Sequence, residues 1–255
     1  MTTGIEPGDS RYPFLLAADI DGTLLGSTKE RSWLCDFLAL YPDSVYLAYM
    51  TGRSLPSVRS LIAEKVLPPP HFICSHVGTE LIDYRNENTE VHERFVAAVD
   101  SSAWDLARIY RMGVGEGIRP QVFNGGRPPF QAGFLWDGNA DTLAAFKERL
   151  VAGISHTVVV SHGRFIDIIP ACLGKGNAVC FLREHIPVDG ERVVVAGDSG
   201  NDRSMFETPF KGIVPANSYD ELKAAADKPW HYHSPYTFST GVLDGLCYFG
   251  FVKGK

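Results

Sequence analysis

The sequence predicts an α/β protein in which an open parallel sheet is interrupted by a separate α+β domain. In the first and last thirds of the chain, continuous apolar runs such as FLLAADI (residues 14–20) alternate with helical stretches. Such runs are typical of strands that a parallel sheet buries on both faces. Between them, residues 87–170 follow another order, in which a helix and two strands are followed by a second helix and two strands. We therefore expect a Rossmann-like core of residues 1–86 and 171–255, with an inserted domain at residues 87–170.

The first third supplies three strands and two helices. Strands are expected at residues 14–20, 44–50 and 71–75, and VGTELI (residues 77–82) would begin a small hairpin. Trp33, Phe37 and Leu38 recur at helical spacing within residues 30–40. A second helix over residues 54–66 has Pro56 near its first turn, where proline is tolerated.

The remaining elements follow from the same patterns. In the inserted domain, helices are expected at residues 95–111 and 140–151, and strands at 118–123, 131–137, 156–161 and 164–170. The last third resumes the core with helices at 175–186 and 218–226, strands at 192–198 and 212–217, and a tail that ends in GVLDGLCYFGF.

Composition excludes several classes of partner. The 255 residues carry a formal net charge of −6. This acidic balance argues against a nucleic-acid partner and against a basic membrane-binding face. No apolar run approaches the roughly 20 residues that a bilayer span requires, and the N-terminal residues lack the pattern of a signal peptide. Five cysteines without a CxxC pair are typical of reduced thiols, so we expect a soluble, cytoplasmic protein.

Polar motifs follow three of the predicted core strands. They are DIDGT (residues 19–23), TGRS (51–54) and GDSGND (197–202), and Lys175 in LGKGNAV begins the helix that returns to the core. Each motif alone is compatible with a turn, a helix cap or a solvated lysine. Ligands of open parallel sheets bind beyond the carboxyl ends of the strands, so the order and shared sheet edge of the motifs predict one site.

Two carboxylates in the first motif need compensation. Asp19 and Asp21 are two residues apart, so in an extended chain both would point to the same side. Like charges about 4 Å apart repel by roughly 4 kcal/mol at an effective dielectric constant near 20. A divalent cation would relieve that repulsion, and the following Gly22-Thr23 would turn the chain out of the strand.

The four motifs resemble those of the haloacid dehalogenase superfamily, the aspartate-nucleophile phosphohydrolases. The inserted domain resembles the αββαββ type of cap in that superfamily. The strings VYLAYMTGRS, SHVGTEL and AGDSGNDRSMFET are similar to those of sucrose-phosphate phosphatases. The resemblance covers most of the chain, and it is more specific in the core than in the cap.

The resemblance implies a role for each core motif. Asp19 would be the nucleophile that forms an aspartyl phosphate, and Asp21 the general acid and base. Mg²⁺ would be held by Asp19 and Asp198, by the backbone carbonyl of Asp21, and by Asp202 directly or through water. Ser199 and Asn201 would orient either the metal ligands or the phosphate. The phosphate oxygens would be bound by Thr51, the Gly52 amide, Lys175 and Asn201.

Substrate choice is expected in the cap, where Gln131 and Arg164 are the predicted sugar contacts. The run QAGFLW replaces a KISYHL-like run of the family, so that Gln131 stands for a lysine and Leu135 for a histidine.

The expected activity is Mg²⁺-dependent hydrolysis of a phosphorylated disaccharide or glycoside. Sucrose 6-phosphate is the first candidate substrate, followed by the phosphates of mannosylfructose and glucosylglycerol. Alternatives are a phosphotransferase or mutase of the same superfamily, and a non-catalytic sugar-phosphate sensor. The synthase that makes the substrate is a candidate partner.

Overall fold

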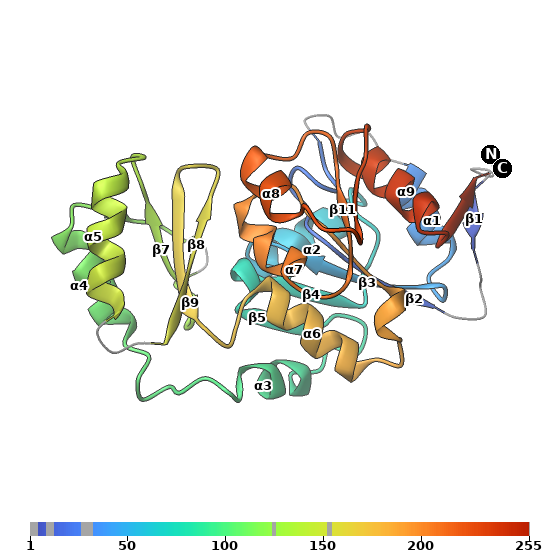
Figure 1. Ribbon diagram of the computed structural model, residues 1–255. Coiled ribbons are helices and arrows are strands. Elements are labelled where there is room, and N and C mark those ends of the chain that lie inside the picture. The colour runs from blue at the N-terminus through green and yellow to red at the C-terminus, as the bar shows by residue number, and fades with distance from the viewer. Residues whose placement is uncertain (1–4, 9–12, 27–32, 124–125, 152–154, 255) are drawn as a thin grey trace.

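The protein folds into two lobes, each built around its own sheet (Figure 1). The computed structural model describes residues 5–8, 13–26, 33–123, 126–151 and 155–254. Residues 30–32 of the first predicted helix lie outside this part of the chain. The fold is the predicted one, a mostly parallel α/β core interrupted by a smaller α+β lobe.

The core lobe contains a seven-stranded sheet. Its strand order is β12-β11-β10-β2-β3-β4-β5, and all neighbours are parallel except β4 and β5. The central strand β2 is buried on both faces, as its apolar run predicts. The strands are β2 (Phe14–Ala18), β3 (Val45–Met50), β4 (Phe72–Ser75), β5 (Glu80–Asp83), β10 (Val193–Ala196), β11 (Lys211–Val214) and β12 (His231–His233).

Helices cover both faces of this sheet and form two hydrophobic clusters. Phe14, Leu16 and Ala18 of β2 face the cluster formed with α1, α2 and α9, whereas Leu15 and Ala17 face that formed with α6, α7 and α8. A short pair of strands, β1 (Ile5–Pro7) and β13 (Val252–Gly254), joins the ends of the described chain. The helices are α1 (Trp33–Leu40), α2 (Leu55–Ala63), α6 (Lys175–His185), α7 (Arg203–Phe206), α8 (Asp220–Ala225) and α9 (Phe238–Tyr248).

The smaller lobe is a four-stranded antiparallel sheet with two helices on one face. Figure 1 shows α4 and α5 on the side away from the core, so the other face of the sheet is turned toward the core. A third hydrophobic cluster, which includes Ile109, Phe134, Phe146 and Ile168, lies between the helices and the sheet. In sheet order the strands are β6 (Arg119–Pro120), β7 (Ala132–Leu135), β9 (Phe165–Pro170) and β8 (His156–Ser161); the helices are α4 (Leu106–Gly115) and α5 (Ala140–Val151).

The predicted helix at residues 95–111 is wrong, because two helices occupy that region. The first, α3 (Glu90–Val96), ends before Asp100, whose side chain accepts the backbone N–H groups of Ser102 and Ala103. The second, α4, begins after Asp105, whose side chain caps it by accepting the N–H of Arg108. Such local side-chain bonds compete with helical hydrogen bonds.

The α3 helix packs with the core lobe rather than with the smaller one. It contacts β5, and its Phe95 belongs to a hydrophobic cluster of the large sheet. The division at residues 86 and 87 stays a prediction, and this packing favours a boundary between α3 and α4 instead.

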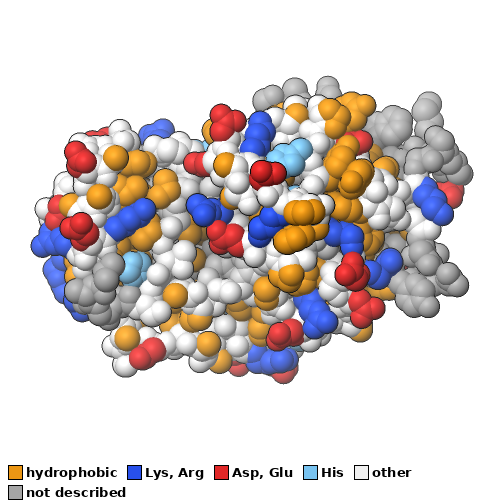
Figure 2. All heavy atoms as spheres, viewed as in Figure 1, with side chains coloured by type: hydrophobic (Ala, Val, Ile, Leu, Met, Phe, Trp, Pro, Cys, Tyr) orange, Lys and Arg blue, Asp and Glu red, His pale blue; other side chains and the backbone are white. Residues whose placement is uncertain are grey.

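The structure bears on surface charge and on helix length. Lys and Arg side chains are interspersed with Asp and Glu on the described part of the face that Figure 2 shows. Within the described residues, the structure contains no helix whose length and apolar character would suit a bilayer.

Candidate active site

The polar motifs meet at the carboxyl ends of three adjacent core strands. Asp19 follows β2, Thr51 follows β3, and Asp198 lies two residues beyond β10. Because β2 pairs with both β3 and β10, the three segments lie side by side. The Asp19 N–H also donates to the Ala196 carbonyl (2.9 Å), which holds the end of β2 against β10. The predicted convergence at one sheet edge is therefore present.

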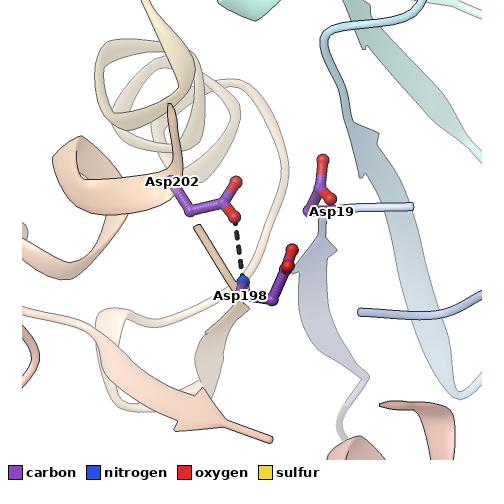
Figure 3. Close-up of side chains that lie close together, drawn as sticks. All are labelled: Asp19, Asp198 and Asp202. Atoms are coloured by element: carbon purple, nitrogen blue, oxygen red, sulfur yellow. Dashed lines mark hydrogen bonds between the residues drawn. The ribbon is translucent and has the colours of Figure 1, made fainter. Parts of the chain in front are cut away.

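Three buried carboxylates form the centre of the site. Asp19, Asp198 and Asp202 each offer one oxygen, and these atoms all lie within 4.8 Å of one another (Figure 3). Asp202 is held by the backbone of its own loop, since its Oδ2 accepts the N–H groups of Asp198 (2.9 Å) and Ser199 (3.2 Å). Carboxylate oxygens at this spacing suit a hard divalent cation such as Mg²⁺.

The turn after β2 allows the Asp198 carboxylate to approach Gly22. Gly22 has a φ of +83°, and a Cβ at this position would lie 2.2 Å from Asp198 Oδ2. The adjacent Thr23 hydroxyl donates to Asp198 Oδ1 (3.2 Å). Glycine is therefore required both by the left-handed backbone and by the approach of Asp198.

Burial and neighbouring negative charge raise the pKa of two of these carboxylates, Asp19 and Asp198. Burial is the largest cause, and it raises the pKa of Asp19 well above its ordinary value and that of Asp198 to about 7, with further contributions from Asp202. The charged forms of Asp19 and Asp198 are therefore short of compensating positive charge in this buried cluster. This deficit is the observation that makes the residues fit a divalent cation.

Lys175 supplies part of the missing charge. Its fully buried ammonium donates to Asp19 (2.8 Å), Asn201 (2.9 Å) and Asp202 (2.6 Å). Burial lowers the pKa of Lys175, but the attraction of Asp19 and Asp202 outweighs burial and raises it, so the lysine stays protonated. One ammonium does not balance three carboxylates, so the site can also accept the positive charge of a metal ion.

Asp21 is not part of this cluster and pairs with an arginine side chain instead. Its side chain is half exposed and forms a two-pronged ion pair with Arg53, in which Nε and Nη2 each lie 2.6 Å from a carboxylate oxygen. Asp19 and Asp21 both line one cavity, and the expectation that their carboxylates point to the same side stays a prediction. The strand ends at Ala18, so strand alternation does not extend to residue 21. Lys175 and Arg53 relieve the repulsion that the sequence suggested.

The second motif forms the neighbouring wall of the site. Thr51 is buried, and its hydroxyl accepts the N–H of Arg53 (3.1 Å). With Gly52 and Asn201 it lines a cavity of about 340 Å³ that also contains Asp19 and Asp21. Ser199 donates to Asn201 Oδ1 (3.3 Å), which suits an orienting role.

The smaller lobe forms the opposite wall of the same cavity. Gln131 is buried there and donates to Asp167 Oδ1 (2.7 Å). Arg164 does not line this cavity; it is exposed at the turn between β8 and β9, so its assignment as a sugar contact stays a prediction. The lining residues of this lobe are Gln121, Gln131, Ser161, His162, Phe165 and Asp167.

Sequence reasoning missed two charged side chains of the site. Arg53 is part of the TGRS motif but received no role, although an arginine so close to Thr51 and Gly52, the predicted phosphate-binding groups, was a signal. Asp167 occupies a strand that reads as apolar, FIDIIP, and this one buried carboxylate among apolar residues was the available clue.

The buried Asp19, the Lys175 ammonium and the cluster of three carboxylates lie together on this fold, as expected for a phosphohydrolase of the haloacid dehalogenase superfamily. The family model described as sucrose-6F-phosphate phosphohydrolase matches residues 12–250, and the chain belongs to this family. The description of this family names a phosphohydrolase, an enzyme class that releases phosphate from a monoester.

Relatives and solved structures agree. The chain is 29% identical over 244 residues to mannosylfructose-phosphate phosphatase of Agrobacterium fabrum, covering 92% of this chain and 96% of that protein. It is 31% identical over 249 residues to glucosylglycerol-phosphate synthase of Pseudomonas anguilliseptica, covering 93% of this chain but 31% of that protein. The sucrose-phosphatase of Synechocystis, solved with sucrose and phosphate, superposes with a TM-score of 0.81 at 26% identity, covering 94% of this chain and 99% of that one.

Proposed function

We propose that this enzyme hydrolyses a phosphorylated disaccharide or glycoside in a Mg²⁺-dependent reaction through an aspartyl phosphate at Asp19. The observation that carries the proposal is the buried cluster of Asp19, Asp198 and Asp202 around the Lys175 ammonium. This arrangement supports Asp19 as a carboxylate nucleophile, because groups that can compensate the charge of a phosphate dianion lie beside it.

The residues divide the reaction into two steps. Asp19 attacks phosphorus, the bond from phosphorus to the sugar oxygen breaks, and Asp21, which must take up a proton from solvent before this step, gives that proton to the sugar oxygen. In the second step Asp21 takes a proton from water as the water attacks the aspartyl phosphate, which releases inorganic phosphate and restores Asp19. Thr51, the Gly52 amide, Lys175 and Asn201 hold the phosphate oxygens meanwhile.

The acidic cluster would hold the metal. Its ligands would be the Asp19 and Asp198 carboxylates and the Asp21 backbone carbonyl, with Asp202 bound directly or through water. When bound, Mg²⁺ neutralises charge on the phosphate and on the carboxylates.

The polar wall of the smaller lobe supports a sugar as the leaving group. The Gln131 amide and the Asp167 carboxylate offer a donor and an acceptor for neighbouring hydroxyl groups. The named relatives act on, or are named for, phosphates of mannosylfructose, glucosylglycerol and sucrose. Because Gln131 and Leu135 differ from the residues of the sucrose enzymes, these three phosphates form the proposed substrate set.

A partner and a compartment follow from the same reasoning. The matched region of the Pseudomonas relative is less than a third of a protein named as a synthase, which supports the synthase of the substrate as a partner of this chain. Five free cysteines support a reducing, cytoplasmic location.

A panel of phosphorylated sugars tests the proposal. Sucrose 6-phosphate, mannosylfructose phosphate and glucosylglycerol phosphate are incubated with Mg²⁺, and released phosphate is measured. At least one should be hydrolysed, and Asp19→Asn should abolish the release. Phosphate passed to an added sugar instead of water would indicate a phosphotransferase, and no turnover of any compound would contradict the proposal.

A further inference from the structure

A strained turn of the core reaches across to the smaller lobe. His76 and Val77, in the 3₁₀ turn His76–Gly78 after β4, have φ values of 53° and 58°. This left-handed conformation is uncommon for residues other than glycine, and for a β-branched residue it is an outlier. The turn is bonded to the phosphate-binding segment, because the N–H groups of His76 and Val77 donate to the carbonyls of Arg53 and Thr51 (both 3.0 Å).

The His76 ring projects from this turn into the smaller lobe. It makes an edge contact with Phe123, with ring centroids 6.2 Å apart. Burial lowers the pKa of His76, and the side chains of Glu80 and Gln131 oppose that shift. Gln131 is therefore a neighbour of the imidazole, so a side chain of the core and one of the smaller lobe meet here, and Gln131 also lines the active-site cavity.

The two side chains carry matching unsatisfied atoms. Among the described residues, His76 Nδ1 and Gln131 Oε1 are buried without a hydrogen-bond partner. Such atoms are rare and costly, about 1–3 kcal/mol each. A donor at one and an acceptor at the other would satisfy both.

The direction of the bond is set by Asp167. An ionised carboxylate only accepts hydrogen bonds, so the group that Gln131 turns toward Asp167 Oδ1 (2.7 Å) is its NH₂. The Gln131 carbonyl oxygen must then face away from Asp167 and needs a donor. The neutral imidazole can supply one only if its proton is on Nδ1.

We propose that His76 is a positioning residue whose Nδ1–H donates to Gln131 Oε1. The result is a directed chain from His76 through Gln131 to Asp167, which links the phosphate-binding segment of the core to the sugar-facing wall. It leaves the second N–H of Gln131 and the second oxygen of Asp167 to meet sugar hydroxyls. The hydrogen bond does not depend on the identity of the substrate, whereas its effect on sugar binding rests on the proposed function.

The imidazole tautomer tests the bond directly. A long-range ¹H–¹⁵N spectrum at pH 8, with the His76 signals assigned by their loss in His76→Phe, distinguishes a proton on Nδ1 from one on Nε2. We expect the Nδ1–H form in the wild type and a shift toward Nε2–H in Gln131→Leu. A wild-type imidazole protonated on Nε2 would overturn the proposal. No substrate is needed, so this result stands whatever happens to the proposed function.

Kinetics test the positioning role. His76→Phe keeps the ring against Phe123 but removes the donor, whereas His76→Asn restores an N–H near the Nδ1 position and tolerates a positive φ. With sucrose 6-phosphate and mannosylfructose phosphate, His76→Phe should raise KM about 10-fold, the value of one net hydrogen bond, with little change in kcat. His76→Asn should recover most of the loss.

Three controls make the result decisive. p-Nitrophenyl phosphate, which is too small to reach Gln131, should be hydrolysed normally by the His76 variants. His92 accepts the Leu81 N–H (3.5 Å) and does not line the active-site cavity. His92→Phe should therefore leave kcat and KM unchanged for every substrate. In a double-mutant cycle, His76→Phe should add almost nothing to Gln131→Leu. Additive effects, or equal losses on p-nitrophenyl phosphate, would overturn the positioning role; a wild type inactive on every phosphate would contradict the proposed function instead.

Discussion

Individual buried charges in this protein have different kinds of support. Lys175 touches two carboxylates, and each of them partly compensates its burial. Asp167 is equally buried, but the hydrogen bond that holds it comes from the neutral amide of Gln131. Burying the ionised form of such a carboxylate costs desolvation free energy that no cation offsets. Its ionisation should therefore oppose folding.

The pH dependence of stability should report Asp167. Burial raises its pKa to about 6, against about 4 in an unfolded chain. Between these values the folded state binds more protons than the unfolded state, so this group lowers stability as pH rises from about 4 to 6. Its contribution is at most about 3 kcal/mol. Denaturant unfolding of Asp167→Asn should show the variant gaining relative to wild type over this range. A constant difference between the two proteins would contradict the assignment.

At the residue scale, motif residues were predictable and contact-dependent residues were not. Asp19, Lys175 and Asp198 lie at strand ends or a helix start, and the elements themselves bring them together. Arg53, His76 and Asp167 depend on side-chain directions across the two lobes. No periodicity in a single sequence encodes those directions.

At the scale of elements, the packing of α6 on α7 places Lys175. The Gly176 N–H donates to the Ser204 hydroxyl (3.1 Å), and a Cβ at residue 176 would lie 2.3 Å from the Ser204 carbonyl oxygen. The first turn of α6 can thus approach α7 only with glycine at this position. That approach sets the depth at which the Lys175 ammonium meets Asp19.

Gly176→Ala should therefore be harmful although alanine favours helices. Intrinsic helix propensity would stabilise the variant by up to about 1 kcal/mol. The clash with backbone should cost more, about 1–3 kcal/mol, and displace Lys175, so both the unfolding midpoint and kcat should fall. Gly190→Ala is the matched control, since its nearest neighbour is a Phe210 ring atom at 3.8 Å. Equal behaviour of the two variants would show that α6 does not need this close approach.

Elements with one strong pattern were predicted well, and those with mixed signals were not. The buried strands β2, β3 and β10 match their apolar runs closely. Helix α9 was left within a tail because glycines weaken its helical pattern. The structure gives a reason for one of them: a Cβ at Gly245 would lie 2.6 Å from Ile213 of β11, so the residue that obscured the helix allows it to pack.

At the scale of the whole molecule, the two lobes divide the work of the site. The core supplies the carboxylates, the lysine and the segment Thr51–Gly52 that is proposed to bind phosphate, while the smaller lobe supplies a polar wall of the cavity. The core residues carry an unbalanced negative charge, so metal binding should be coupled to the stability of the folded chain.

Mg²⁺ should therefore stabilise the protein as well as activate it. A ligand that binds only the folded state at 100 times its Kd adds about 2.7 kcal/mol, which thermal unfolding detects. Asp198→Asn should reduce this thermal shift, and excess chelator should abolish hydrolysis. Ca²⁺ should inhibit, because it accepts more ligands and can engage both oxygens of Asp19. Full turnover in the metal-free enzyme would contradict the assigned cluster.

The central claim is that Asp19 forms the phosphoenzyme while Asp21 serves the leaving group and then water. General acid catalysis is typically worth about 10²- to 10⁴-fold, and nitrophenolate leaves without this help. The Asp21→Asn enzyme should consequently transfer phosphate from p-nitrophenyl phosphate to Asp19 and then stall, because the second step lacks its base.

Rapid mixing of Asp21→Asn with p-nitrophenyl phosphate and Mg²⁺ measures this directly. We predict a burst of nitrophenol close to one equivalent of enzyme, followed by slow turnover, and no burst from Asp19→Asn. An Asp21→Asn enzyme that is slowed equally on p-nitrophenyl phosphate and on a sugar phosphate, with no burst, would contradict the account.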